Sequence, residues 1–176
     1  MTHRILATAA LVSALASGAC GGDDNPASPS PQPGSFTFVS TLSPGNEVPP
    51  VANAEASGMA TVTVTLAVTR DASGSITGGT ATFTVNLSGF PPGTVISAAH
   101  IHQAPAGLNA GVAINTGLAS GEVTLASGSG SFTKSGVNVS ASLANALVAN
   151  PAGFYFNVHS TLNPSGVARG QLALQQ

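Results

Sequence analysis

Charged side chains are scarce in this chain of 176 residues, and that scarcity excludes several classes of protein. Only 6% of the residues are Asp, Glu, Lys or Arg, and the formal net charge is −2. An ordinary soluble domain carries roughly 25% charged residues. Nucleic-acid binding needs a basic stripe that neutralises phosphates, and the four Lys and Arg residues are too few and too scattered to form one. Coiled coils and long surface helices are excluded because their outer faces are charged.

Cysteine is almost absent, since Cys20 is the single one, and tryptophan is missing altogether. One thiol cannot form an intramolecular disulfide framework or a thiolate zinc cluster. The sequence also lacks the H-E-x-x-H and P-loop patterns and a Ser/His/carboxylate arrangement, so nucleophilic hydrolysis and phosphoryl transfer have no candidate residues. What is there, a chain rich in Thr, Ser, Gly and Val, is typical of a compact all-β domain.

The first residues have the pattern of an export signal. Arg4 precedes an uncharged apolar run over residues 5–16 that is too short to span a hydrocarbon core of about 30 Å. The sequence SGAC at residues 17–20 resembles a bacterial lipobox, which predicts a signal peptide over residues 1–19 and lipidation of Cys20. The alternative is cleavage after the small residues at 14–16, which leaves Cys20 as a free thiol.

A low-complexity segment follows the cysteine. Residues 20–35 carry four prolines together with Gly, Ser and Asp, a composition that favours extended backbone and offers no apolar side chains to bury. We therefore predict a linker between a lipid anchor and one folded domain over residues 36–176. This organisation predicts a protein outside the cytoplasm that is anchored to a bacterial membrane and faces the periplasm or the cell surface.

The rest of the chain alternates with period two. Apolar residues alternate with Thr over residues 60–68 and again over 80–87, which predicts two half-buried strands joined by a hairpin at residues 71–74. Shorter strands are expected at 36–42, 95–102, 130–134 and 154–159, and a single closing strand at 168–174. A short helix is expected at 142–149. Seven to nine strands with regular turns predict an all-β fold, an antiparallel Greek-key sandwich or barrel.

Three histidines fall inside the predicted domain. His100 and His102 are two residues apart on an expected strand, so both imidazoles leave the same face while Ile101 leaves the other. His159 lies at one of the polar positions that alternate with apolar ones along its own strand. Because successive side chains of a strand point to opposite faces, all three rings are expected on the outer face of a sheet. Imidazole-only ligation suits copper or zinc. The alternative is that the three rings hydrogen-bond to neighbouring groups and shape a loop.

Two isolated charges complete the candidate residues. Glu47 begins an E-V-P-P segment after the first expected strand, and Arg169 lies at the start of the last one. As structural residues they brace a loop and pair with each other, which is worth about 0–1 kcal/mol if the pair is exposed. The alternative is that the two residues belong to a functional site.

Four segments together resemble chordin-type (CHRD) domains. They are LSPGNEVPPV at 42–51, AAHIHQAPAG at 98–107, FYFNVHS at 154–160 and NPSGVARGQL at 163–172, in the family's order. The resemblance implies a β-barrel-like domain that occurs in secreted animal growth-factor antagonists and in exported microbial proteins. For the microbial members it implies no established activity.

A more distant likeness joins the histidines to the Cu,Zn superoxide dismutases. NLSGFPPGTVISAAHIH at 86–102 is similar to the passage before their copper-binding H-x-H, and GVARGQLAL at 166–174 is similar to their last strand. The likeness implies a superoxide dismutase-like sandwich. An immunoglobulin-like sandwich is the alternative strand arrangement. It also implies that His100, His102 and His159 ligate copper and that Arg169 guides an anion. Residues 103–158 contain no His or Asp, so a zinc subsite has no ligands.

Two functions follow from these observations. The first is a membrane-tethered, non-enzymatic module that binds an unidentified protein or glycan or serves a structural role, without nucleic acid. The second is a copper-binding or redox protein that uses His100, His102 and His159. The second requires the three imidazoles to share one coordination sphere, whereas the first allows them to be too far apart or hydrogen-bonded elsewhere.

Overall fold

The two longest alternating segments form the middle of the first sheet. The computed structural model describes residues 34–176, in which β2 (Met59–Arg70) and β3 (Ile76–Ser88) pair antiparallel as predicted. In the hairpin between them, the Asp71 carboxylate accepts hydrogen bonds from the backbone N–H groups of Ser73 and Ser75. An Asx-type turn of this kind satisfies donors that the sheet leaves free.

Three further strands complete this first sheet, whose order is β10-β1-β2-β3-β7. β1 (Ser35–Leu42) and β10 (Ala173–Leu174) lie on one side of β2, and β7 (Gly130–Ser140) lies beside β3. Apolar residues of β2 and β3 are buried at alternate positions, while the threonines between them face outward. β7 is longer than the expected strand at 130–134.

The second sheet carries the strands with the histidines. Its order is β5-β4-β8-β9, and β6 also pairs with β4. The bounds are β4 (Thr94–His102), β5 (Val112–Asn115), β6 (Val123–Leu125), β8 (Tyr155–Ser160) and β9 (Ala168–Gln171). β5 and β6 were not expected as strands, because segments of four and three residues are too short to show a period.

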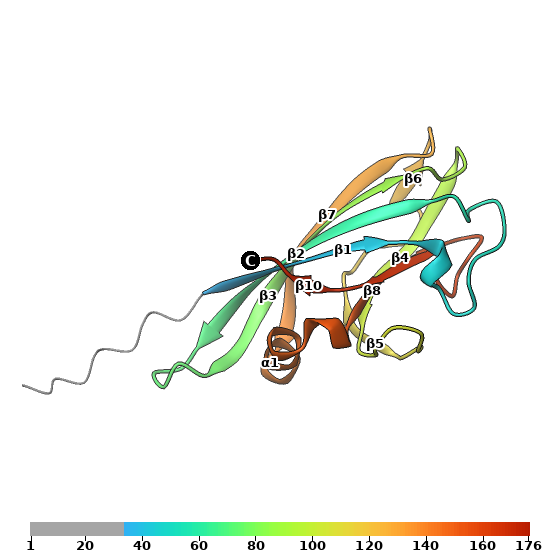
Figure 1. Ribbon diagram of the computed structural model, residues 1–176. Helices are drawn as coiled ribbons and strands as arrows, with labels where there is room; N and C mark the ends of the chain where they lie inside the picture. The colour runs from blue at the N-terminus through green and yellow to red at the C-terminus, as the bar shows by residue number, and fades with distance from the viewer. Residues whose placement is uncertain (1–33) are drawn as a thin grey trace, which may run out of the picture. The chain divides into compact units, whose positions relative to one another are not determined.

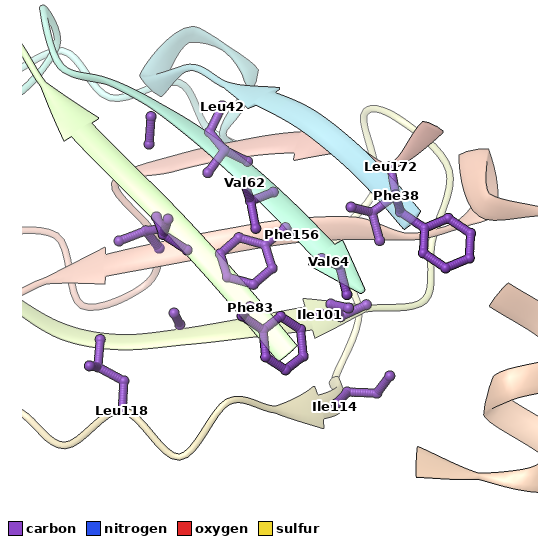
Figure 2. Close-up of a cluster of buried hydrophobic side chains, with 14 of the residues drawn as sticks. Phe38, Leu42, Val62, Val64, Phe83, Ile101, Ile114, Leu118, Phe156 and Leu172 are labelled. Atoms are coloured by element: carbon purple, nitrogen blue, oxygen red, sulfur yellow. The ribbon is translucent and has the colours of Figure 1, made fainter. Parts of the chain in front are cut away.

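The two sheets face each other (Figure 1), and their buried apolar side chains form one cluster. The rings of Phe83 from β3 and Phe156 from β8 lie with their centroids 5.9 Å apart, and Figure 2 shows them in the cluster between the sheets. Ile101 from β4 and Val64 from β2 are fully buried in the same cluster. The sandwich is confirmed. The described strands form two sheets that do not close, so the barrel alternative was wrong.

The expected helix is confirmed as α1 (Ala141–Ala149). It begins after Ser140, whose side chain accepts a hydrogen bond from the N–H of Leu143 as an N-cap. Leu147 is buried in the core, so the helix covers one end of the sandwich. Two short 3-10 helices, η1 (Pro44–Asn46) and η2 (Pro151–Gly153), occur in the connections.

The single closing strand predicted at 168–174 was wrong. The segment divides into β9 in the second sheet and β10 in the first. Leu172 lies between them with its side chain buried, and the chain crosses from one sheet to the other at this residue. The two strands belong to different sheets because Arg169 of β9 pairs with Asn157 of β8, whereas Leu174 of β10 pairs with Phe38 of β1.

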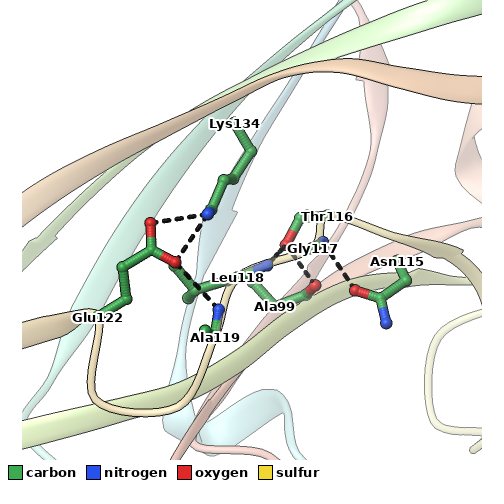
Figure 3. Close-up of polar contacts among 8 residues, drawn as sticks. All are labelled: Ala99, Asn115, Thr116, Gly117, Leu118, Ala119, Glu122 and Lys134. Atoms are coloured by element: carbon green, nitrogen blue, oxygen red, sulfur yellow. Dashed lines mark hydrogen bonds and ion pairs between the residues drawn. The ribbon is translucent and has the colours of Figure 1, made fainter.

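The connection between β5 and β6 is held back onto the sandwich, as Figure 3 shows. Thr116 donates a hydrogen bond of 2.8 Å from its hydroxyl to the carbonyl of Ala99, the residue before His100. Further along, Lys134 of β7 pairs with Glu122 at 2.7 Å. These contacts hold the segment 116–122 against β4 on one side and β7 on the other.

The predicted signal peptide, Cys20 and nearly all of the predicted linker lie outside the described residues. Within residues 34–176, no helix combines the length and apolar character that a membrane crossing requires.

Candidate metal site

All three histidines of the domain lie on the outer face of the second sheet. His100 and His102 come from β4, and Ile101 between them is fully buried in the core. His159 comes from β8, where it pairs with Ala98 in the register of β4. Antiparallel pairing of β4 and β8 therefore brings together residues that are 59 positions apart in the sequence.

The three rings offer nitrogen atoms at metal-ligand spacing. One ligand nitrogen from each of His100, His102 and His159 lies within 4.8 Å of the other two. His100 Nδ1 and His159 Nε2 are 3.2 Å apart. Two nitrogens bound to one copper or zinc ion at about 2.0–2.1 Å lie about 3 Å from each other. This pair already has the separation that a shared ion requires.

Backbone carbonyls determine which nitrogen two of the rings, those of His102 and His159, present. His102 Nδ1 lies 3.0 Å from the carbonyl oxygen of Ala110, and His159 Nδ1 lies 2.9 Å from that of Pro164. A carbonyl oxygen only accepts, so both Nδ1 atoms carry hydrogen and both Nε2 atoms present lone pairs. His100 Nδ1 then donates to His159 Nε2, and a metal ion would displace that one proton. Metal-ligating histidines are usually oriented in this way.

Burial favours the neutral form of His100 and His159. Desolvation, followed by the neighbouring charges of His159 and His102, lowers the pKa of His100 to about 4. Desolvation also lowers the pKa of His159, against the opposing effect of its hydrogen bond to Pro164. Neutral imidazole is the form that binds metal, and at pH 7 neither of these two rings carries the second proton of an imidazolium.

His102 presents a lone pair that meets no partner. Its side chain is buried, and Nε2 has no hydrogen bond although Nδ1 is paired. The ring stacks on Tyr155, with centroids 4.7 Å apart and planes inclined by 10°. The Tyr155 hydroxyl accepts a hydrogen bond from the N–H of Ala110, whose carbonyl holds His102. A buried acceptor without a partner is rare and calls for an explanation, and a bound ion is one.

Three loops cover this face of the sheet. They are residues 43–58 after β1, 103–111 after β4 and 161–167 after β8. Asn109 donates to the carbonyl of Val48, and Asn53 and Asn163 bond to each other through their amides. Figure 1 shows the loop after β1 beside the loop after β8. The covering loops explain why an outer face of a sheet is buried here.

Arg169 braces these loops rather than reaching the histidine nitrogens. Its Nε donates to the carbonyl of Asn46 at 2.6 Å, and its Nη1 donates to the carbonyl of Leu108 at 3.2 Å and the side chain of Asn109 at 2.7 Å. Its guanidinium lies over the Tyr155 ring, 4.7 Å from the centroid. The arginine therefore joins two of the covering loops to the sheet.

Glu47 is buried beside Arg169, but the expected pair does not form. Among the described residues, no ion pair joins the two side chains within 4.0 Å. Burial raises the pKa of Glu47 to about 7, and the positive charge of Arg169 opposes the shift. Its Oε1 atom has no hydrogen-bond partner.

Sequence reasoning missed the supporting residues of this site. Tyr155 and Asn157 share the polar register of β8 with His159, which is a signal that the alternation contains. The carbonyl groups of Ala110 and Pro164 leave no signal, because every residue has a carbonyl. Chemically, the assembled site can hold one ion on three neutral imidazoles, the donor set that copper and zinc accept.

The family of the chain follows from a comparison with family models. The model of the CHRD domain matches residues 38–172, which contain both sheets, all three histidines, Glu47 and Arg169. No curated protein matches the chain, and no solved structure does. The match covers most of the sequence and nearly all of the described residues. The chain belongs to the CHRD-domain family.

Proposed function

We propose that this CHRD-domain protein binds one copper ion through His100, His102 and His159. The observation that carries the proposal is the convergence of three ring nitrogens within 4.8 Å, with the Nε2 atom of buried His102 left without another partner. Two of the rings are oriented by backbone carbonyls, so the donor set is pre-organised.

Copper is favoured over zinc by the chemistry of the donors. Among divalent first-row ions, affinity for a nitrogen site rises to a maximum at Cu²⁺ and falls at Zn²⁺. The three-nitrogen cluster contains no carboxylate or thiolate that would favour another ion. The bound ion would supply Lewis acidity or one-electron chemistry, and the three histidines would hold and orient it.

The module without a metal is the less favoured of the two sequence hypotheses. That hypothesis allowed the histidines to lie far apart or to be fully hydrogen-bonded to other groups. In the structure the three rings lie close together, and His102 Nε2 has no hydrogen-bond partner. An interaction with a protein or a glycan stays a prediction, since no described contact identifies such a partner.

We further propose that the copper site is displayed outside the cytoplasm on a lipid anchor at Cys20. The apolar run, the lipobox-like sequence and the proline-rich linker support this location. CHRD domains are typically extracellular, which agrees with it.

Metal content after loading tests the copper proposal. The full chain is prepared with Cys20→Ser, so that no thiol competes for copper, and is incubated with Cu(II) or Zn(II) before unbound metal is removed. We expect one copper per chain, and at least tenfold weaker retention in His102→Ala. Gln103→Ala is the matched control, because Gln103 is the exposed neighbour of His102. Copper retention that is equal in His102→Ala and in the wild type would contradict the proposal.

A further inference from the structure

Within residues 34–176, four buried side-chain polar atoms lack a hydrogen-bond partner, and they belong to residues of one region. They are Glu47 Oε1, His102 Nε2, Asn157 Oδ1 and Arg169 Nη2. Strands β4, β8 and β9 of the second sheet contribute three of them, and the covering loop 43–58 contributes the fourth. A bound metal accounts for His102. The Asn157 oxygen needs a separate explanation, because leaving a buried acceptor unpaired costs about 1–3 kcal/mol.

Asn157 lies between the histidines and the arginine. It pairs with His100 of β4 on one side and with Arg169 of β9 on the other. His159 follows Asn157 by two residues on the same face of β8. Asn157 itself is only 3% exposed. Directly paired residues on one face of a sheet have Cβ atoms about 4.5–5.5 Å apart. The asparagine is therefore an immediate neighbour of two of the three ring ligands.

Gly166 indicates how the Asn157 amide is turned. A Cβ at residue 166 would lie 2.6 Å from Glu47 Oε2 and 2.7 Å from Asn157 Nδ2, so glycine is needed there for space as well as for its φ of 138°. The Nδ2 end of the amide thus faces the side where Glu47 and Gly166 lie. The Oδ1 end is on the other side of Cγ, which leaves it free to accept from a donor outside that cluster.

We propose that Asn157 Oδ1 accepts a hydrogen bond from a small protic ligand, water in the first instance, in the fourth coordination position of the metal. This inference rests on the proposed function. Three protein ligands leave a position open, which water or substrate commonly fills. The water donates a lone pair to the metal and one O–H to Oδ1, an atom that can only accept. A site built in this way favours small protic ligands over ligands that carry no hydrogen.

Azide, an anion without a hydrogen to donate, tests this preference on the copper-loaded full chain. Asn157→Leu removes the acceptor at similar volume, and Asn157→Asp keeps an acceptor oxygen at that position. Since azide must displace the hydrogen-bonded water, we expect Asn157→Leu to bind azide about fivefold more tightly than the wild type. Asn157→Asp should bind it no more tightly than the wild type. Copper content is measured in every sample.

The outcomes separate the two proposals. Equal azide affinity in the wild type and in copper-loaded Asn157→Leu would overturn the role of Asn157, while the copper site would stand. A wild type that takes up no copper would overturn the proposed function and this inference with it. If the variants do not fold, pulsed paramagnetic resonance of the wild type in D2O decides the matter. Strongly coupled deuterons of a copper-bound water, distinct from the weakly coupled N–D groups of the histidine rings, support the inference, and their absence overturns it.

Discussion

His100 Nδ1 lies 3.2 Å from His159 Nε2, although 59 positions separate the two residues in the sequence. The contact crosses from β4 to β8 on a face that three loops cover. A metal ion in place of the shared proton would tie these strands together at the same point. Because an ion that binds only the folded state stabilises it, the site links metal binding to the stability of the second sheet.

Tyrosine fluorescence should report copper binding directly. Tyr155 is the one tyrosine of the chain, tryptophan is absent, and its ring stacks on His102 at 4.7 Å. We expect Cu(II) to quench this emission with a break at one equivalent, because a paramagnetic ion would lie next to the stacked ring. Zn(II), with a filled shell, should leave most of the emission. Quenching in the wild type that rises linearly without a break would contradict a specific site.

The buried carboxyl of Glu47 should make stability depend on pH in a defined direction. Its pKa is raised from 4.5 to about 7 in the folded protein. Between these values the folded state holds a proton that the unfolded state has lost, so the stability from this group is present below pH 4.5 and is lost as the pH rises through 7. As the pH rises from 4.5 to above 7, the free energy of unfolding of the wild type should fall by on the order of 3 kcal/mol relative to that of Glu47→Gln.

The measurement is denaturant unfolding of the metal-free protein at several pH values. His100 acts in the opposite direction, because its lowered pKa costs stability as the pH falls from 6.5 toward 4. The difference between the wild type and Glu47→Gln removes this common contribution. A difference that stays constant from pH 4 to 8 would show that the carboxyl of Glu47 is not perturbed.

A close approach between the two sheets should make Gly170 intolerant of a side chain. A Cβ at this position of β9 would collide with the backbone carbonyl of Thr41 in β1. We expect Gly170→Ala to cost about 1–3 kcal/mol or more of the free energy of unfolding. Gly111→Ala is the control, since nothing lies within 4 Å of its Cβ position, and its effect should stay within about 0.5 kcal/mol. Equal melting temperatures of the two variants would contradict the close packing.

The membrane anchor is tested by Cys20→Ser in the full chain expressed with its signal. Without the thiol no acyl chain can be attached, so the protein should move from the membrane fraction to the soluble extracytoplasmic fraction. Ser28→Ala, a change in the predicted linker, should leave the distribution as in the wild type. Continued membrane association of Cys20→Ser would rule out lipidation as the anchor.

Much of the fold could be predicted from alternation, because the period of two determines which residues of a strand face the core. The pattern over residues 60–68 and 80–87 corresponds to β2 and β3, and parity places the three histidines on one face. The change of sheet at Leu172 could not be predicted, since that buried residue continues the same alternation. Only the hydrogen-bond partners of β9 and β10 distinguish the two strands.

The surroundings of the candidate site were less predictable. The burial of Glu47 depends on loops whose paths no local pattern indicates, and so does the orientation of His102 by the carbonyl of Ala110. The distance that keeps Glu47 and Arg169 from pairing is a tertiary property as well. Metal binding itself stays a prediction, which rests on the geometry of the three rings.

The paramagnetic resonance spectrum of Cu(II) bound to the full Cys20→Ser chain tests the three-histidine site most directly. One equivalent of copper should give a single spectrum with hyperfine splitting from three imidazole nitrogens. In His102→Ala the splitting should fall to that of two nitrogens or the signal should be lost, while Gln103→Ala should give the wild-type spectrum. Two results would contradict the three-histidine site. One is a wild-type sample that gives only the spectrum of unbound Cu(II), and the other is a wild-type spectrum that His102→Ala leaves unchanged.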